Sequence, residues 1–299
     1  MADHIDARLK TMGHTNGIGR EIIVESKKTN LFYNPLLYFS DNINGGNSPE
    51  PVVLGNLIFV GDEALVRKEG FVSGFSFDLN GRLIYANDRY LRHSASVTYV
   101  YSPEHKLGIR SAAAKVCNFN HLTNWWYLDA CAETLRISKD MTDETKTDVS
   151  LGASKFFAIG DHIYNQTSFK LNRHFSDVFT QNQIEIGLTS IHQADVYSSL
   201  NVILGDTIKN ELSTRVALNG QVSALLAKRR LSISGGFSYS DGGDLFGFER
   251  NEHTYKLSVS YPIWDNLRLS VGYRETDSSI DYFDVSTPTF HIQLGQVKL

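Results

Sequence analysis

Few side chains in this sequence have the types and the spacing that chemistry requires. Cys117 and Cys131 are its two cysteines, and they are equidistant from Asn124. If two strands paired about a turn at Asn124, the thiols would lie opposite each other and could form a disulfide. A disulfide would indicate an oxidising compartment such as the periplasm or cell surface. Two unrelated thiols are an equally good interpretation.

His174 and Ser176 are the candidates for nucleophilic chemistry. The run His174-Phe175-Ser176 is similar to the His-x-Ser pairing of outer-membrane phospholipases, in which histidine activates serine. Because the run lies at a predicted strand end, an ordinary turn is the favoured interpretation. The sequence has no nucleophile elbow, phosphate-binding glycine loop or pair of Cys-x-x-Cys units. We therefore predict no enzyme, no cofactor and no metal site.

Charge and hydrophobicity argue against two further classes of protein. The 29 Lys and Arg residues against 33 Asp and Glu give a net charge of -4, which argues against nucleic acid as a partner. Hydrophobic residues make up 41% of the chain. No apolar run approaches the roughly 18 residues of a membrane-spanning helix. A membrane β-barrel stays compatible, because its strands need apolar residues only at alternate positions.

Alternation of apolar and polar residues is the dominant pattern of the chain. From Tyr255 to Tyr261 every odd position is apolar and every even position is polar, and the pattern resumes at Leu267. A period of two predicts a β-strand with one apolar face. The predicted strands are Leu31–Phe39, Phe71–Tyr85, Tyr90–Tyr101, Leu107–Asn118, Trp125–Ile137, Val149–Ile159, Ile163–Arg173, Ile184–Ser190, Val196–Leu204, Leu212–Val222, Leu231–Tyr239, Tyr255–Ile263, Leu267–Tyr273 and Phe290–Leu294. No segment has a sustained helical period, so the chain is predicted to be all-β.

The lengths of the predicted loops favour a membrane barrel over a soluble sandwich. Connections after odd strands are often long, as at Ser40–Gly70, Ser138–Asp148, Ser240–His253 and Glu275–Thr289, whereas those after even strands are mostly short. Outer-membrane barrels have short turns at one rim and long external loops at the other, but a sandwich has no reason to sort its loops. We predict an antiparallel up-and-down transmembrane β-barrel of about 14 strands, with a soluble β-domain as the alternative.

The predicted location is the bacterial outer membrane. The barrel is assigned to residues 31–299, and residues 1–30 are predicted to be an N-terminal linker or plug segment. Met1-Ala2-Asp3-His4 does not begin a signal peptide, because no basic region precedes an apolar stretch. If the barrel prediction is right, the sequence begins after a removed segment.

The polar faces of the strands predict the lining of a lumen. They consist mainly of Ser, Gly, Thr and Asn with occasional charges, whereas a Lys or Arg on a lipid face would cost about 2–4 kcal/mol at the midplane. Lys115 and Lys155 fall on the apolar parity, so each must lie near a rim or mark an error of register. The residues predicted to line the lumen are Arg92, Arg110, Lys170, Glu185, Arg215, Lys256, Arg268 and Arg274.

The segment Leu37-Tyr38-Phe39-Ser40-Asp41-Asn42-Ile43-Asn44-Gly45-Gly46 resembles the opening of the barrel in surface lipoprotein assembly modifiers. The predicted strand number and the hairpins that run to the chain end are also similar to that family. The resemblance implies a periplasmic tetratricopeptide-repeat domain before the barrel and a role in moving lipoproteins or secreted binding proteins across the outer membrane. Because this sequence lacks the helical repeats, it would be the barrel part or a reduced relative.

The leading functional prediction is an export or translocation pore for lipoproteins or secreted proteins. Its expected partners are outer-membrane lipid, a secreted or lipoprotein client and a periplasmic partner domain, with no nucleic acid. Two alternatives stay open, namely a porin-like passive channel for small solutes and a structural or adhesive barrel that acts through its external loops. Conductance in planar bilayers would separate them, because a porin gives steady currents and an export pore conducts only with its client.

Overall fold

The computed structural model describes residues 27–46, 48, 51–54, 57–60, 62–86, 89–160, 163–192, 195–245, 247–264, 267–294 and 297–298. Most of the linker or plug segment predicted at residues 1–30 lies outside the described residues. Its last four residues begin the first strand at Lys27, four positions before the predicted start at Leu31.

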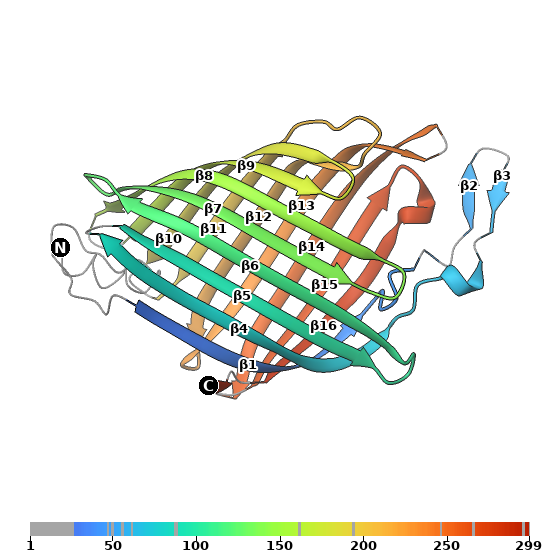
Figure 1. Cartoon of the computed structure of the whole chain (residues 1–299), viewed down its shortest axis with the longest axis horizontal. Helices are drawn as coiled ribbons and strands as arrows, with labels where there is room; N and C mark the ends of the chain where they lie inside the picture. The colour runs from blue at the N-terminus through green and yellow to red at the C-terminus, as the bar shows by residue number, and fades with distance from the viewer. Residues whose placement is uncertain are drawn as a thin grey trace.

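Fourteen antiparallel strands form one closed sheet (Figure 1). Each strand pairs with the next along the chain, and the last pairs with the first through Leu37 and Ile292. The strands are β1 (Lys27–Ser40), β4 (Gly70–Ala86), β5 (Arg89–Ser102), β6 (Leu107–His121), β7 (Trp126–Ser138), β8 (Asp143–Ile159), β9 (Ile163–Ser176), β10 (Thr180–His192), β11 (Tyr197–Gly205), β12 (Ser213–Leu226), β13 (Arg229–Leu245), β14 (Phe248–Trp264), β15 (Leu267–Ser278) and β16 (Val285–Leu294). A short β17 (Val297–Lys298) also pairs with β1. The predicted antiparallel barrel of about 14 strands is confirmed.

The apolar residues of the alternating pattern form the outer surface of the barrel. Leu151 on β8 is 63% exposed and Val97 on β5 is 56% exposed. The residues on the other parity of these strands, such as Ser150 and Ser94, line a cavity that extends from β5 to β11. A cavity bounded by so many neighbouring strands lies on the concave side of the sheet. The polar face is therefore the inner face, as in membrane barrels.

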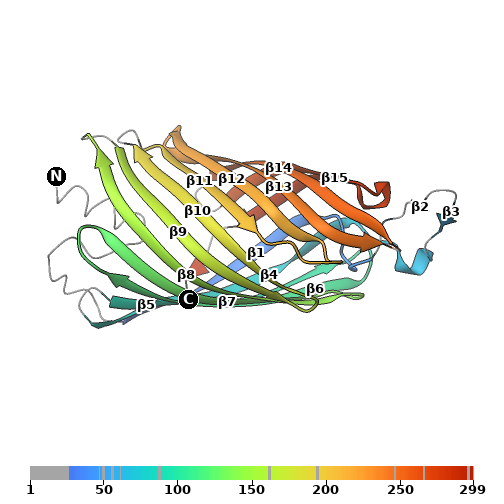
Figure 2. The ribbon, with the colours of Figure 1, turned by 90° about the horizontal axis from the view of Figure 1, so that it is seen from above.

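The two ends of the barrel differ in their connections (Figure 2). At one end the strands are joined by short turns, and the start of β1 and the end of β16 lie there. At the other end the connections include residues 41–69, 206–212 and 279–284. The first of these carries the hairpin of β2 (Val52–Leu54) and β3 (Leu57–Phe59), which projects beyond the barrel in Figures 1 and 2. We call these ends the short-turn rim and the long-loop rim.

Several strands extend further toward the long-loop rim than the alternation predicts. β8 begins at Asp143 rather than at Val149. The predicted loop Ser240–His253 is largely paired, because β13 continues to Leu245 and β14 starts at Phe248. Alternation is required only where one face of a strand contacts lipid. Beyond that level backbone pairing continues without an apolar stripe, so the sequence pattern ends before the strand does.

Helical structure in the described part of the chain consists of two short 3₁₀ segments, η1 (Glu63–Leu65) and η2 (Asp281–Phe283). None of the helices among the described residues has the length and apolar character needed to cross a membrane.

Candidate functional site

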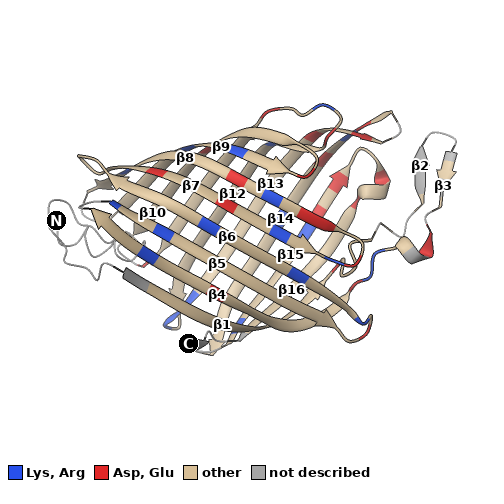
Figure 3. Cartoon of the chain, viewed as in Figure 1, with Lys and Arg blue, Asp and Glu red and all other residues tan. Residues whose placement is uncertain are grey.

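The lumen is the candidate functional site, and its wall from β5 to β11 carries charges of both signs (Figure 3). A cavity of about 700 Å³ lies against this wall, and Arg92, Lys170 and Glu185 are among the residues that line it. Lys170 Nζ lies 3.4 Å from Glu185 Oε1. The same carboxylate accepts hydrogen bonds from the side-chain amides of Asn172 at 3.3 Å and Asn201 at 3.1 Å. On this part of the wall, positive and negative charges compensate each other.

In strand β6 the residues predicted to face the lumen lie on the outer face, and those predicted to face lipid lie on the inner face. Lys115 faces the lumen, where its Nζ lies 2.6 Å from Glu133 Oε2. Arg110, five residues away, therefore lies on the outer face opposite Tyr99, and its assignment to the lumen is wrong. The reason is that Ala112–Ala114 fill the middle of the strand. Small apolar side chains fit either face, so the sequence at that point does not indicate which residues face the lumen.

Lys155 lies near the short-turn rim on the outer face of β8. Its Cα partner on β7 is Trp126, which is 42% exposed. The Nζ of Lys155 lies 5.2 Å from the centre of the Trp126 ring, a cation–π distance. Near the rim the amine can reach the polar headgroups, so its position on the apolar parity is tolerated. The two lysines on the apolar parity thus have different explanations, namely a register error for Lys115 and a rim position for Lys155.

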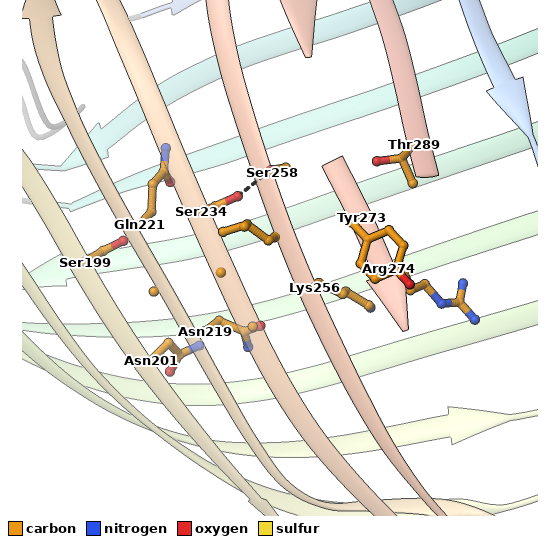
Figure 4. A pocket seen from close by; sticks show the side chains of 14 residues that line it. Ser199, Asn201, Asn219, Gln221, Ser234, Lys256, Ser258, Tyr273, Arg274 and Thr289 are labelled. Atoms are coloured by element: carbon orange, nitrogen blue, oxygen red, sulfur yellow. Dashed lines mark hydrogen bonds between the residues drawn. The ribbon is translucent and has the colours of Figure 1, made fainter. Parts of the chain in front are cut away.

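The opposite wall, from β12 to β16, carries most of the other residues that the sequence assigns to the lumen. Lys256 and Arg274 are direct partners on β14 and β15 and lie at a cavity of about 410 Å³ (Figure 4). Arg268 has the same parity on β15 and pairs with Gln293. Arg215 lies at a β-bulge of β12, and its guanidinium donates a hydrogen bond to the carbonyl of Gly205 at 2.8 Å.

Cys117 and Cys131 form a disulfide bond. They are direct Cα partners on β6 and β7, and both line the cavity of the β5–β11 wall. The equal distance of the two cysteines from Asn124 therefore predicted their pairing correctly. The bond ties the two strands together on their inner face.

The segment at residues 41–46 lies inside the barrel at the long-loop rim. Ile43 is fully buried against Val72, Val100 and Ile109, which are inward-facing residues of β4, β5 and β6. The next residue, Asn44, is also fully buried. We call residues 41–46 the mouth segment, because it covers part of the inner wall where the lumen opens.

Polar contacts join the mouth segment to the β7–β8 turn. The carbonyl of Asn44 accepts a hydrogen bond from the backbone N–H of Met141 at 2.8 Å. The amine of Lys139 donates to the carbonyl of Asn42 at 2.7 Å. Burial lowers the pKa of Lys139 below its usual range, and the nearby carboxylates of the chain oppose this in part. The mouth segment is therefore held by apolar packing against β4, β5 and β6 and by hydrogen bonds to the β7–β8 turn.

His174 and Ser176 face different partners, and the described residues show no hydrogen bond between them. His174 Nδ1 lies 2.8 Å from Asp148 Oδ1. Ser176 Oγ accepts the backbone N–H of Phe179 at 3.1 Å and so closes the β9–β10 turn. Among the described residues no group of three or more His, Cys, Asp or Glu side chains is placed to hold a metal ion. Ser176 thus serves the turn, whereas His174 belongs to β9 and is the direct partner of Gln181 on β10.

Comparisons with known proteins show the fold. No protein family and no curated protein sequence matches the chain. Among solved structures, Pseudomonas putida OprB is 8% identical, with a TM-score of 0.51 over 92% of this chain and 94% of that chain. Acinetobacter baumannii OccAB3 is also 8% identical, with a TM-score of 0.47 over 92% of this chain and 100% of that chain. The chain has the barrel fold of bacterial outer-membrane porins, in agreement with the predicted location.

The resemblance to surface lipoprotein assembly modifiers is wrong. The similar structures are porin-type barrels, and no family match supports a relation to the lipoprotein modifiers. The likeness shows the fold alone, so the predicted export pore and its porin-like alternative both stay proposals. No finding supports protein transport or translocation. The secreted or lipoprotein client and the periplasmic partner domain stay untested predictions.

Proposed function

We propose that the chain is a passive channel for small hydrophilic solutes in the bacterial outer membrane. The polar lumen carries the proposal. Cavities of about 700 Å³ and 410 Å³ lie along its two walls. Their lining consists largely of hydroxyl, amide and charged side chains, which can exchange hydrogen bonds with water and with polar solutes. Such a surface lowers the cost of removing a solute from bulk water.

The outer face supports the same proposal. Large apolar side chains are exposed on all sides of the barrel, with Leu257 on β14 at 58% and Leu151 on β8 at 63%. In water this area would be an unfavourable contiguous apolar surface. Lipid covers this apolar surface without cost, and the lumen is then the polar path from one rim to the other.

Planar bilayers and liposome swelling test the proposal. We expect the purified, refolded protein to give steady ohmic currents in KCl without any added protein. Liposomes that contain it should swell in neutral sugars at rates that fall as the size of the sugar increases. A correctly folded barrel that gives no current would refute the proposal, and currents that appear only with a secreted protein would restore the export pore.

A further inference from the structure

Two positive charges in the middle of the β14–β15 wall of the lumen lack acidic partners. Lys256 and Arg274 are direct cross-strand partners on the inner face. Among the described residues neither forms an ion pair or a hydrogen bond with a carboxylate. Like charges opposite each other destabilise an antiparallel pair. An anion that bridges the two groups would offset this repulsion.

The opposite wall shows what compensated lumen charges look like in the same barrel. Lys115 Nζ lies 2.6 Å from Glu133 Oε2, and Lys170 Nζ lies 3.4 Å from Glu185 Oε1. Each of these lysines thus has an acidic partner on a neighbouring strand. The absence of such partners is therefore particular to Lys256 and Arg274, whereas nearer the long-loop rim of the same wall Arg250 forms an ion pair with Glu252.

The wall beside Lys256 leaves room for a ligand. Its partner on β13 is Gly236, and the space of the missing side chain is taken by the Asn219 amide, whose Oδ1 lies 2.8 Å from where a Cβ atom would be. Figure 4 shows Lys256 and Arg274 close together, with hydroxyl and amide side chains around them. The cavity measures about 410 Å³, within the range of roughly 300–1,000 Å³ of small-molecule pockets. Besides the two cations its polar side chains include Asn201, Asn219, Gln221, Ser234, Ser258 and Thr289.

We propose that Lys256 and Arg274 bind the carboxylate of a small hydroxylated organic acid as it passes through the channel. This inference rests on the proposed channel function and names the class of solute. The guanidinium of Arg274 can hold a carboxylate with two parallel hydrogen bonds, and Lys256 adds a point charge. The amides and hydroxyls of the cavity donate and accept hydrogen bonds, so they suit the hydroxyl groups of the same solute.

Block of the KCl current by glucuronate tests the site, with glucose as the neutral control of similar size. We expect glucuronate to reduce the wild-type current at concentrations at which glucose has little effect. In Lys256→Gln/Arg274→Gln the half-blocking concentration of glucuronate should rise at least about tenfold, equivalent to about 1.4 kcal/mol. The matched control is Arg110→Gln/Arg173→Gln, which removes the same charge from outward-facing positions opposite Tyr99 and Val149. This control should keep the wild-type block.

The outcomes separate the site from the channel. A folded wild-type barrel without current would contradict the channel itself. A steady current that glucuronate and glucose affect equally would contradict only the site, as would an unchanged block in Lys256→Gln/Arg274→Gln. If inorganic phosphate blocks as well as glucuronate does, charge alone is recognised and the assignment to hydroxylated carboxylates is overturned. Heat-dependent mobility in gels confirms that each variant is folded.

Discussion

The substitution Asn44→Ala tests whether the mouth segment narrows the channel. The side chain of Asn44 is fully buried, and it links the mouth segment to the part of the chain that leads into β4. Its Oδ1 accepts the backbone N–H of Gly46 at 3.2 Å and of Lys68 at 2.9 Å. Its Nδ2 donates to the carbonyl of Val66 at 2.9 Å. Alanine removes these three hydrogen bonds together with the weaker contact of Nδ2 with Met141 Sδ at 3.6 Å.

The size of the effect follows from these three hydrogen bonds. At about 1 kcal/mol each, their loss destabilises the docked conformation of the segment by about 3 kcal/mol. A change of this size raises the ratio of released to docked segment roughly 100-fold. Ile43 continues to pack against β4, β5 and β6. We therefore expect a barrel that stays folded while its mouth opens more often.

Single-channel recording in planar bilayers measures the result. Asn44→Ala should show larger unitary steps, or frequent transitions to a larger step, than the wild type. The matched control is Asn118→Ala. Asn118 lies away from the mouth, and its side chain accepts a hydrogen bond from the Tyr85 hydroxyl at 2.7 Å. This control should keep the wild-type conductance.

Hydrogen exchange separates two ways in which the reasoning can fail. If the amides of Gly46 and Lys68 exchange faster in Asn44→Ala but the conductance is unchanged, the segment does not narrow the path. If their exchange is also unchanged, the three hydrogen bonds do not hold the segment, and the estimate of about 3 kcal/mol is wrong.

Three further predictions concern the wall of the barrel. Replacing Cys117 and Cys131 together by serine should lower the free energy of unfolding by about 3 kcal/mol in urea titrations, since the bond closes a loop of about 15 residues; an unchanged midpoint would contradict this. Leu151→Arg should lower the stability of the barrel in lipid by about 2–4 kcal/mol, whereas Ser150→Arg on the lumen side should not. Equal losses of stability in the two variants would refute the orientation of β8. Gln181→Ala removes hydrogen bonds to two backbone carbonyls at 2.7 and 2.8 Å, which should destabilise the loop at residues 206–212 by about 2 kcal/mol. The measurement is proteolysis within this loop, which should become faster. Resistance equal to that of the wild type would show that Gln181 does not hold the loop.

The fold was predictable because lipid imposes a strict pattern on each strand. From Tyr255 to Tyr261 the odd residues must be apolar, and a period of two is enough to identify the strand. The mouth segment lacks any such constraint. Its Asn-rich and Gly-rich sequence predicts a loop, but nothing in the pattern indicates that Ile43 returns to the inner wall or that Asn44 contacts the β7–β8 turn. Contacts between distant loops depend on barrel closure, which local periodicity does not describe.

The error at β6 was avoidable from the sequence itself. If Cys117 pairs with Cys131, every pair of residues on these strands must have the same sum of positions, and Lys115 then lies opposite Glu133. A lysine opposite a glutamate is a favourable cross-strand pair, and it belongs on the polar face. Arg110 has the other parity and would have been assigned to the outside. The cysteine spacing thus determined which residues of β6 face the lumen, although the alanines of this strand do not distinguish its two faces. A disulfide fixes the register between two strands, whereas alternation concerns one strand alone.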